Sequence, residues 1–245
     1  MAPGSQVQVL HLLEGARSAT GIAVIIDVFR AFTLAPCAVA RGARRILPVA
    51  TPEEALVLKR ADPALLLAGE RDGRPLPGFD FPNSPAAILR ADLAGRSLVL
   101  RTSAGVQGLL AATRADEVVT GSFVNAAAIV AYLRRRSPAR ISLVCMGWGG
   151  SEPAAEDQAC ADYLAAGLEG EFPDFDAIRA RLRADPSGAK FFDPARPWFP
   201  PEDFAACMRA SVYPWVLRLA RDETGRASLE RLAPAAAAGS PAAAL

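Results

Sequence analysis

The chain has 245 residues, of which 51% are hydrophobic and 22% are charged, and its formal net charge is +1. This composition suits a globular protein that is long enough to form one large α/β domain with a sizeable core. The balanced charge supplies no basic field for nucleic acid or an anionic membrane. No apolar run reaches the ~18 residues of a membrane span, and the first residues lack the basic start of a signal peptide.

Cysteine and histidine usage narrows the chemistry. Cys37, Cys145, Cys160 and Cys207 lie far apart and form no CxxC pair. We expect reduced thiols in a cytoplasmic protein, buried as small apolar side chains. His11 is the only histidine, so we expect no zinc site, and acid–base chemistry would depend on carboxylates, a thiol or metal-bound water.

Apolar runs alternate with helical patterns through the first 170 residues. We expect strands near 7–12, 21–26, 44–50, 65–68, 97–100, 117–121 and 141–145, and helices near 31–41, 51–60, 86–91, 106–114, 126–136 and 156–168. This alternation predicts a three-layer α/β/α fold with a mostly parallel or mixed central sheet. Residues 1–232 are interpreted as one domain.

The composition changes after Gly170. Residues 172–201 are rich in proline, aspartate and aromatic residues, which predicts irregular structure around one helix and a lid over a site. Residues 204–220 are expected to form a last helix, or two helices separated by Pro214. Residues 233–245 consist almost entirely of Ala, Pro, Gly and Ser, which predicts a disordered tail.

The strand at 21–26 ends in a candidate catalytic residue, Asp27. Open α/β sheets build their sites at the carboxyl ends of strands. An aspartate there can bind a metal, attack phosphorus or simply cap the following helix. Arg30 would face an anion at the start of that helix.

The stretch 69–85, GERDGRPLPGFDFPNSP, has a density of charge that a plain connection does not need. We interpret Glu70 as a ligand of a metal ion and Arg71 as a group that binds an anion. Asn83 and Ser84 would be delivered to a substrate, and Ser84 also suits the N-cap of the next helix.

Two later turns carry polar groups of similar kind. Thr102, Ser103 and Gly105 follow the strand at 97–100, where a Thr-Ser pair also suits simple helix capping. Asn125 follows the strand at 117–121. Parallel strands end at one edge of a sheet, so these groups are expected to converge with Asp27.

Glu156 and Asp157 begin the helix at 156–168. They are either first-turn partners of the helix dipole or metal ligands. Several carboxylates combined with arginines and hydroxyls suit a divalent metal bound to a phosphorylated anion.

Six motifs in series resemble those of the 2-phosphosulfolactate phosphatase family. They are DVFRA at 27–31, GER at 69–71, GFDFPNSP at 78–85, TSAG at 102–105, GSFVN at 121–125, and Cys145 followed by Gly147, Glu156 and Asp157. The resemblance covers about residues 20 to 168. It implies an α/β/α fold and a Mg²⁺-dependent hydrolase that removes phosphate from 2-phosphosulfolactate or a related 2-phospho-hydroxycarboxylate. In the family, that step belongs to sulfolactate or coenzyme M synthesis.

The resemblance and the residues together give a hypothesis for the site. Asp27, Glu70, Glu156 and Asp157 would hold Mg²⁺, while Arg30 and Arg71 neutralise phosphoryl oxygens. The nucleophile would be metal-bound water or Asp27. The substrate would contact Asn83, Ser84, Thr102, Ser103, Gly105, Asn125 and Cys145.

The chain also departs from the family pattern. The family commonly has Thr-Thr-Asn-Gly-Thr where this chain has TSAGV at 102–106, and Cys-Ala-Gly where it has CMGW at 145–148. A non-catalytic anion-binding protein on the same scaffold is therefore an alternative. A nucleotide-binding enzyme that uses the glycine-rich turn at 147–150 is another. The expected partner is a small phosphorylated hydroxy acid, with no nucleic acid and no membrane, and a homodimer is left open.

Overall fold

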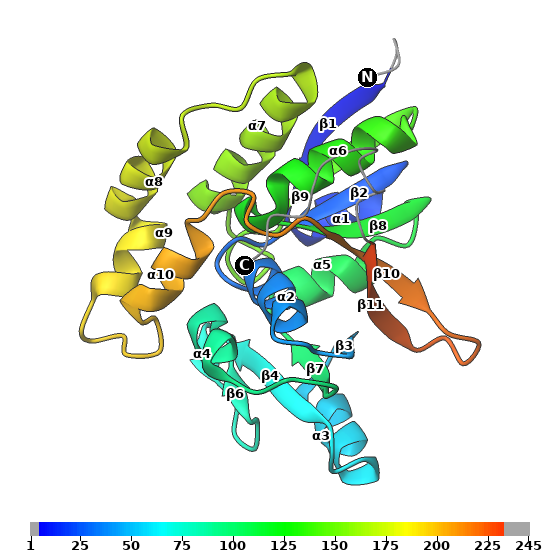
Figure 1. Ribbon diagram of the computed structural model, residues 1–245, viewed down its shortest axis with the longest axis vertical. Coiled ribbons are helices and arrows are strands. Elements are labelled where there is room, and N and C mark those ends of the chain that lie inside the picture. The colour runs from blue at the N-terminus through cyan, green and yellow to red at the C-terminus, as the bar shows by residue number, and fades with distance from the viewer. Residues whose placement is uncertain (1–4, 233–245) are drawn as a thin grey trace, which may run out of the picture.

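The computed structural model of the chain describes residues 5–232, and Figure 1 shows its elements. The strands are β1 (Gln6–His11), β2 (Ile22–Ile26), β3 (Arg45–Pro48), β4 (Leu66–Arg71), β5 (Arg74–Pro75), β6 (Phe81–Pro82), β7 (Ser97–Arg101), β8 (Glu117–Gly121), β9 (Arg140–Cys145), β10 (Val216–Arg221) and β11 (Ala227–Leu232). The helices are α1 (Leu12–Ser18), α2 (Ala31–Ala40), α3 (Pro52–Ala61), α4 (Pro85–Arg90), α5 (Gly105–Ala111), α6 (Ala126–Arg136), α7 (Ala155–Glu169), α8 (Phe175–Ala184), α9 (Pro186–Ala189) and α10 (Pro201–Cys207), with 3₁₀ turns η1 (Phe123–Asn125) and η2 (Lys190–Phe192).

The strands form one sheet in the order β1-β9-β2-β8-β10-β11-β3-β7-β4-β5, and β6 pairs with β4. The first half-sheet (β1, β9, β2 and β8) is parallel throughout, and so is the second half-sheet (β3, β7 and β4). The prediction of an α/β fold with a mostly parallel, mixed central sheet flanked by helices is confirmed.

The hairpin β10–β11 joins the two half-sheets and pairs antiparallel with each of them. The two half-sheets therefore run in opposite directions along the sheet. Their carboxyl ends nevertheless meet, because the backbone N–H of Gly105, after β7, donates to Oδ2 of Asp27, after β2, at 2.8 Å. The convergence expected of a single parallel edge is reached instead by a sheet that folds back on itself.

Helices α2 and α5 lie between the two half-sheets (Figure 1). Eight of the ten residues of α2 are buried. This surrounding explains its sequence, AFTLAPCAVA, because a helix that is apolar on every side must be enclosed on every side. Helices α6 and α7 cover the outer face of the first half-sheet, and α3 covers the outer face of the second.

Local sequence signals account for most element boundaries. All five residues of β2 are buried, as its unbroken apolar run predicts for a central parallel strand. The hydroxyl of Thr51 caps α3 by accepting from the Glu54 N–H, with Pro52 in the first turn. Both features confirm the predicted elements.

The prediction of a helix over 204–220 is wrong. Only the first residues of that stretch are helical, at the end of α10, and the chain then enters the β10–β11 hairpin. The hairpin turn is closed by Asp222, whose Oδ1 accepts from the N–H groups of Thr224 and Arg226. A turn-forming DETG stretch between two six-residue strands is the signal that a helical interpretation overlooks.

The segment 172–201 has more regular structure than predicted, since α9 and η2 follow the expected helix α8. The predicted tail, 233–245, lies outside the described residues. All four cysteines are free and buried, as expected from their isolation in the sequence. Within residues 5–232, no helix combines the length and hydropathy needed to cross a membrane.

Candidate active site

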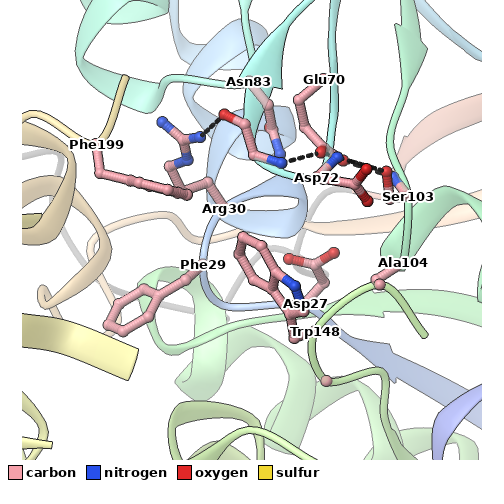
Figure 2. A pocket seen from close by; sticks show the side chains of 13 residues that line it. Asp27, Phe29, Arg30, Glu70, Asp72, Asn83, Ser103, Ala104, Trp148 and Phe199 are labelled. Atoms are coloured by element: carbon pink, nitrogen blue, oxygen red, sulfur yellow. Dashed lines mark hydrogen bonds between the residues drawn. The ribbon is translucent and has the colours of Figure 1, made fainter. Parts of the chain in front are cut away.

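A pocket opens where the carboxyl ends of the two half-sheets meet. Five of the predicted site residues line it: Asp27, Arg30, Glu70, Asn83 and Ser103. Figure 2 shows the carboxylates of Asp27 and Glu70 entering the pocket from different elements. The sheet therefore brings together the core of the predicted site.

Asp27 is buried, and backbone donors fix both of its carboxylate oxygens. Oδ1 accepts from the Ala31 N–H at 3.1 Å and Oδ2 accepts from the Gly105 N–H at 2.8 Å. Burial raises the pKa of Asp27 to about 6, helped by the negative charges of Glu70 and Glu156 and opposed by the two N–H donors. The aspartate therefore orients the start of α2 and still presents a negative charge to the pocket at neutral pH.

Gly105 has to be a glycine for this arrangement to form. A Cβ atom at Gly105 would lie 2.5 Å from Oδ2 of Asp27 and 2.9 Å from its Cβ atom. The role of Gly105 is thus to admit the aspartate side chain against the backbone of α5.

Glu70 is the penultimate residue of β4 and lies inside the strand, not in the loop that follows it. Its Oε2 accepts from the Gly73 N–H at 2.6 Å, and its Oε1 accepts from the Ser103 N–H at 2.5 Å. Asp72 and Gly73 both have positive φ and join β4 to β5 in a tight two-residue turn. The glutamate thus fixes two turns around the pocket while its carboxylate faces inward.

Arg30 is one of the most deeply buried side chains in the protein, with 1% of its surface exposed. Its guanidinium donates to Oδ2 of Asp203 at 2.7 Å and to the carbonyls of Trp198 and Gly73 at 2.9 and 3.1 Å. The Phe199 ring lies 4.7 Å from its central carbon. Arg30 lines the pocket, but a carboxylate and two carbonyls already occupy its terminal nitrogens.

Asn83 and Ser84 are neighbours with different environments. Asn83 is buried at the pocket wall, and its Oδ1 has no hydrogen-bond partner among the described residues. Ser84 instead donates to Oδ1 of Asp203 at 2.6 Å and accepts from the Ala87 N–H, which caps α4. The free amide oxygen of Asn83 is available to a ligand, whereas the Ser84 hydroxyl is used by the fold.

Thr102 and Ser103 also differ in whether their hydroxyls serve the fold or face the pocket. The Thr102 hydroxyl accepts from the Val106 N–H and caps α5, so the capping alternative describes it. Ser103 lies on the pocket wall, where its hydroxyl donates to Oε2 of Glu70 at 3.3 Å.

Asp157 connects two turns beneath the pocket. Its oxygens accept from the N–H groups of Val28 and Gly147, at 2.9 and 2.8 Å. Burial, followed by the charge of Glu156, raises the pKa of Asp157 well above its ordinary value. Burial likewise raises the pKa of Glu156, whose Oε2 has no partner among the described residues. Neither residue lines the pocket.

Three predicted residues lie away from the pocket. Arg71 is exposed, because consecutive residues of a strand point to opposite faces and Glu70 takes the inward one. Asn125 is buried and donates to the carbonyl of Trp215 at 3.3 Å. Cys145 is packed in the core beside α7, where burial strongly raises the pKa of its thiol and disfavours the thiolate that a nucleophile needs.

The four carboxylates proposed for Mg²⁺ are not assembled as one ligand set. In the part of the chain that the structure describes, no group of three or more His, Cys, Asp or Glu side chains is arranged to hold a metal ion. Asp27 and Glu70 remain as a pair at the pocket. Mg²⁺ is commonly bound by one or two carboxylates, retained waters and substrate phosphate, so this pair fits the ion.

Sequence reasoning expected an aromatic-rich lid over the site but named no aromatic side chain as a site residue. Phe29, Trp148 and Phe199 line it, and Phe199 comes from the segment predicted to be a lid. Asp203, the partner of Arg30, was missed because nothing in the local sequence of α10 distinguishes it from a first-turn acid. The cluster of phenylalanines and tryptophans between 191 and 204 was the available signal.

The sequence of the chain matches a known protein family. The model of the family described as 2-phosphosulpholactate phosphatase matches residues 9–185. The chain belongs to the 2-phosphosulpholactate phosphatase family. This membership confirms the resemblance read from the six motifs and the predicted class of enzyme, a phosphoric monoester hydrolase.

Individual members of the family show how much of the chain is shared. A probable 2-phosphosulfolactate phosphatase of Bacillus subtilis is 32% identical over 206 residues, which cover 82% of this chain and 88% of the relative. Proteins of the same description from Caldicellulosiruptor saccharolyticus and Deinococcus radiodurans are each 36% identical. Those matches cover 62% and 66% of this chain, and 64% and 68% of the relatives.

Proposed function

We propose that this protein is a Mg²⁺-dependent phosphatase that hydrolyses 2-phosphosulfolactate or a related 2-phospho-hydroxycarboxylate to the hydroxy acid and phosphate. One observation carries the proposal: the buried carboxylates of Asp27 and Glu70 face one pocket, each held by two backbone N–H donors. Family membership and the descriptions of the relatives support the same substrate class.

The charge of the pocket supports the requirement for a cation. Its lining contains three acids, Asp27, Glu70 and Asp72, and one base, Arg30, which is already paired with Asp203. An anionic substrate would be repelled by such a wall. When bound to the two buried carboxylates, Mg²⁺ would supply positive charge for the phosphoryl oxygens and activate water.

The residues of the chain have distinct roles in this proposal. Asp27 and Glu70 hold the ion, and their backbone donors keep the two carboxylates from rotating away. Asn83 offers its unpartnered amide to the hydroxy acid part of the substrate. Phe29, Trp148 and Phe199 exclude bulk water from one side, which strengthens the electrostatic contacts inside.

The hydrogen bonds of Asp27 favour water over Asp27 as the nucleophile. Both of its oxygens accept from backbone N–H groups, so the carboxylate cannot rotate freely toward phosphorus, while a second lone pair on each oxygen remains for a metal ion. A free carboxylate oxygen aimed at phosphorus would be expected of a covalent nucleophile. We therefore assign Asp27 to orientation and metal binding, and we extend the proposal to a cytoplasmic enzyme of sulfolactate or coenzyme M synthesis.

The test measures phosphate release by the purified full chain from 2-phosphosulfolactate, 2-phospholactate and phosphoglycolate, with Mg²⁺ and with EDTA. We expect turnover with Mg²⁺ only, and Asp27→Ala or Glu70→Ala should lower kcat/KM by roughly 10³-fold or more. Asp116→Ala is the matched control, because this acid is exposed and does not line the pocket. Retained activity in both buried variants would refute the metal-site assignment.

The same assay addresses the non-catalytic alternative. If none of the three phosphoesters is hydrolysed while sulfolactate raises the melting temperature, the protein is an anion-binding member of the family. Ligand-induced stabilisation without turnover is the signature of binding alone.

A further inference from the structure

We propose that Lys190 binds the sulfonate of the substrate, and so makes this protein select 2-phosphosulfolactate over 2-phospho-hydroxycarboxylates that lack a second strong acid. The inference rests on the proposed function and deepens it. Lys190 lies in η2, beyond the region 9–185 that the family model matches, and none of the comparisons gives it a role.

The ammonium of Lys190 is buried against the aromatic side of the pocket. Only 9% of the residue is exposed. Its Nζ lies 4.6 Å from the centre of the Trp148 ring, 5.3 Å from Phe199 and 5.8 Å from Phe29. These three rings are the ones that line the pocket, so the positive charge stands directly behind its aromatic wall.

This ammonium has no close protein partner. Among residues 5–232, Lys190 forms no ion pair within 4.0 Å and no side-chain hydrogen bond. The rings supply cation–π attraction but accept none of its three N–H donors. Burial lowers the pKa of Lys190, and the more distant charges of Glu156, Asp157 and Asp27 only oppose this shift. A buried, under-bonded cation of this kind is stabilised when a ligand brings an anion.

The other buried cation, Arg30, lines the pocket but is bound to the protein at both terminal nitrogens, and its buried Nε has no partner in the described structure. Arg30 already donates to Asp203 and to two carbonyls. Lys190 is therefore the cation next to the pocket with the larger share of its donors free among residues 5–232. The three oxygens of a sulfonate match the three N–H donors of an ammonium, and a weakly basic sulfonate costs less to desolvate than a carboxylate.

A second cavity provides the way to Lys190. It shares the Trp148 ring with the active pocket, and its charged lining consists of two bases, Lys190 and Arg196, and two acids, Glu152 and Asp185. The buried Ser187 hydroxyl lies beside the Glu156 carboxylate. An acid group that passes the edge of Trp148 would meet the Lys190 ammonium.

The first experiment compares three substrates with the variants Lys190→Met and Lys190→Arg. The substrates are 2-phosphosulfolactate, 2-phospholactate, which lacks the sulfonate, and O-phosphoisethionate, which lacks the carboxylate. Lys190→Met should lower kcat/KM for the two sulfonates by roughly 10- to 100-fold, mainly through KM, and leave 2-phospholactate within about twofold. Lys190→Arg should restore most of the loss, because it keeps the charge.

The controls separate this role from general support of the fold. Only two of the 27 basic residues are lysines, Lys59 and Lys190, so Lys59→Met is a natural control and should leave all three substrates unaffected. An equal loss on every substrate in Lys190→Met would overturn the inference. Absence of any wild-type turnover would refute the proposed function instead.

Amine labelling of the wild-type protein tests the contact without a variant. Sulfolactate should slow acylation of Lys190 severalfold relative to Lys59, as followed by mass spectrometry, while lactate should not. Equal labelling rates with and without sulfolactate would overturn the inference even if Lys190→Met failed to fold.

Discussion

The two sides of the pocket are held in place by different forces. On the carboxylate side, Asp27 and Glu70 are fixed by backbone N–H donors at the ends of strands. On the capping side, formed by residues 186–207, Phe199 and Lys190 are fixed by ring packing and by the ion pair between Arg30 and Asp203. The donors on the carboxylate side belong to the backbone at strand and turn positions, whereas the contacts on the capping side are between side chains. The carboxylate side is therefore suited to constant chemistry and the capping side to adjustable recognition.

The largest effect is expected where the two sides join, at Asp203. Its carboxylate is fully buried and binds Arg30, the Ser84 hydroxyl and the Ala86 N–H. Asp203→Ala leaves the Arg30 charge buried and unpaired, and should lower the free energy of unfolding by about 3 to 5 kcal/mol. Urea denaturation followed by circular dichroism measures this.

Asp193→Ala is the control for this prediction, because Asp193 pairs with Arg196 in the same segment but at the surface. The expected change there is below about 1 kcal/mol. Equal stabilities of the Asp203 and Asp193 variants would mean that the ion pair does not hold the capping side to the strands.

The carboxylate side should be intolerant of a single added methyl group. In Gly105→Ala, the new Cβ would displace the Asp27 carboxylate and break its bond to the residue 105 N–H. We expect kcat/KM to fall by roughly 10²-fold with a folded protein, since misplacement of a catalytic group by ~1 Å has effects of that size. Steady-state phosphate release provides the measurement.

Gly95→Ala is the matched control, because Gly95 has φ of +69° but no atom within 4 Å of an added Cβ. This variant should lose about 1 kcal/mol of stability and keep its activity. Normal activity in Gly105→Ala would show that the close approach of Asp27 is not needed for the reaction.

The acid groups of the pocket should make the metal-free protein more stable in mild acid. Asp27 has a pKa near 6 in the folded chain against an ordinary 3.8, so the folded state binds the proton more tightly. With EDTA present, the free energy of unfolding should increase as the pH falls from 8 to 5, by about 1 kcal/mol from Asp27 alone. The same gain should disappear when the pH is raised back through 6. Urea denaturation at each pH tests the slope, which should be shallower in Asp27→Asn and also with Mg²⁺.

The smallest effect is expected at Arg71. The sequence places Arg71 next to Glu70, but the strand directs its side chain away from the pocket. Arg71→Ala should change stability by less than about 0.5 kcal/mol and kcat/KM by less than threefold. The loss of activity in Arg71→Ala is to be compared with the loss in Glu70→Ala, the variant of the neighbouring residue. A loss in Arg71→Ala that approaches the loss in Glu70→Ala would mean that Arg71 reaches the substrate during turnover.

The carboxylate side could be predicted from sequence because its signals are local. An unbroken apolar run ending in Asp27 identifies a central strand and the end that carries the site. The charge of its segment identifies Glu70 as a site residue. Because Glu70 lies inside β4, the next residue, Arg71, points away from the site. The strand period of two was the physical information that the loop interpretation lacked.

The capping side could not be predicted in the same way, because its contacts join residues far apart in sequence. The pairing of Arg30 with Asp203 spans more than 170 positions, and no local pattern announces it. The hairpin after α10 was mistaken for a helix because its strands are half-buried and short, with apolar residues spaced closely enough to suit either period. The residues of its turn, and not the hydrophobicity of its strands, distinguish a hairpin from a helix here.

The β10–β11 hairpin also sets the order in which the protein can be completed. It is the element through which the two half-sheets are hydrogen-bonded to each other, and it ends at Leu232, the last described residue. A chain emerging from the ribosome can form the pairs within each half early, but cannot close the continuous sheet until these late residues are available. Assembly of the whole sheet is therefore a step of high contact order that cannot be completed before residues 216–232 have been synthesised.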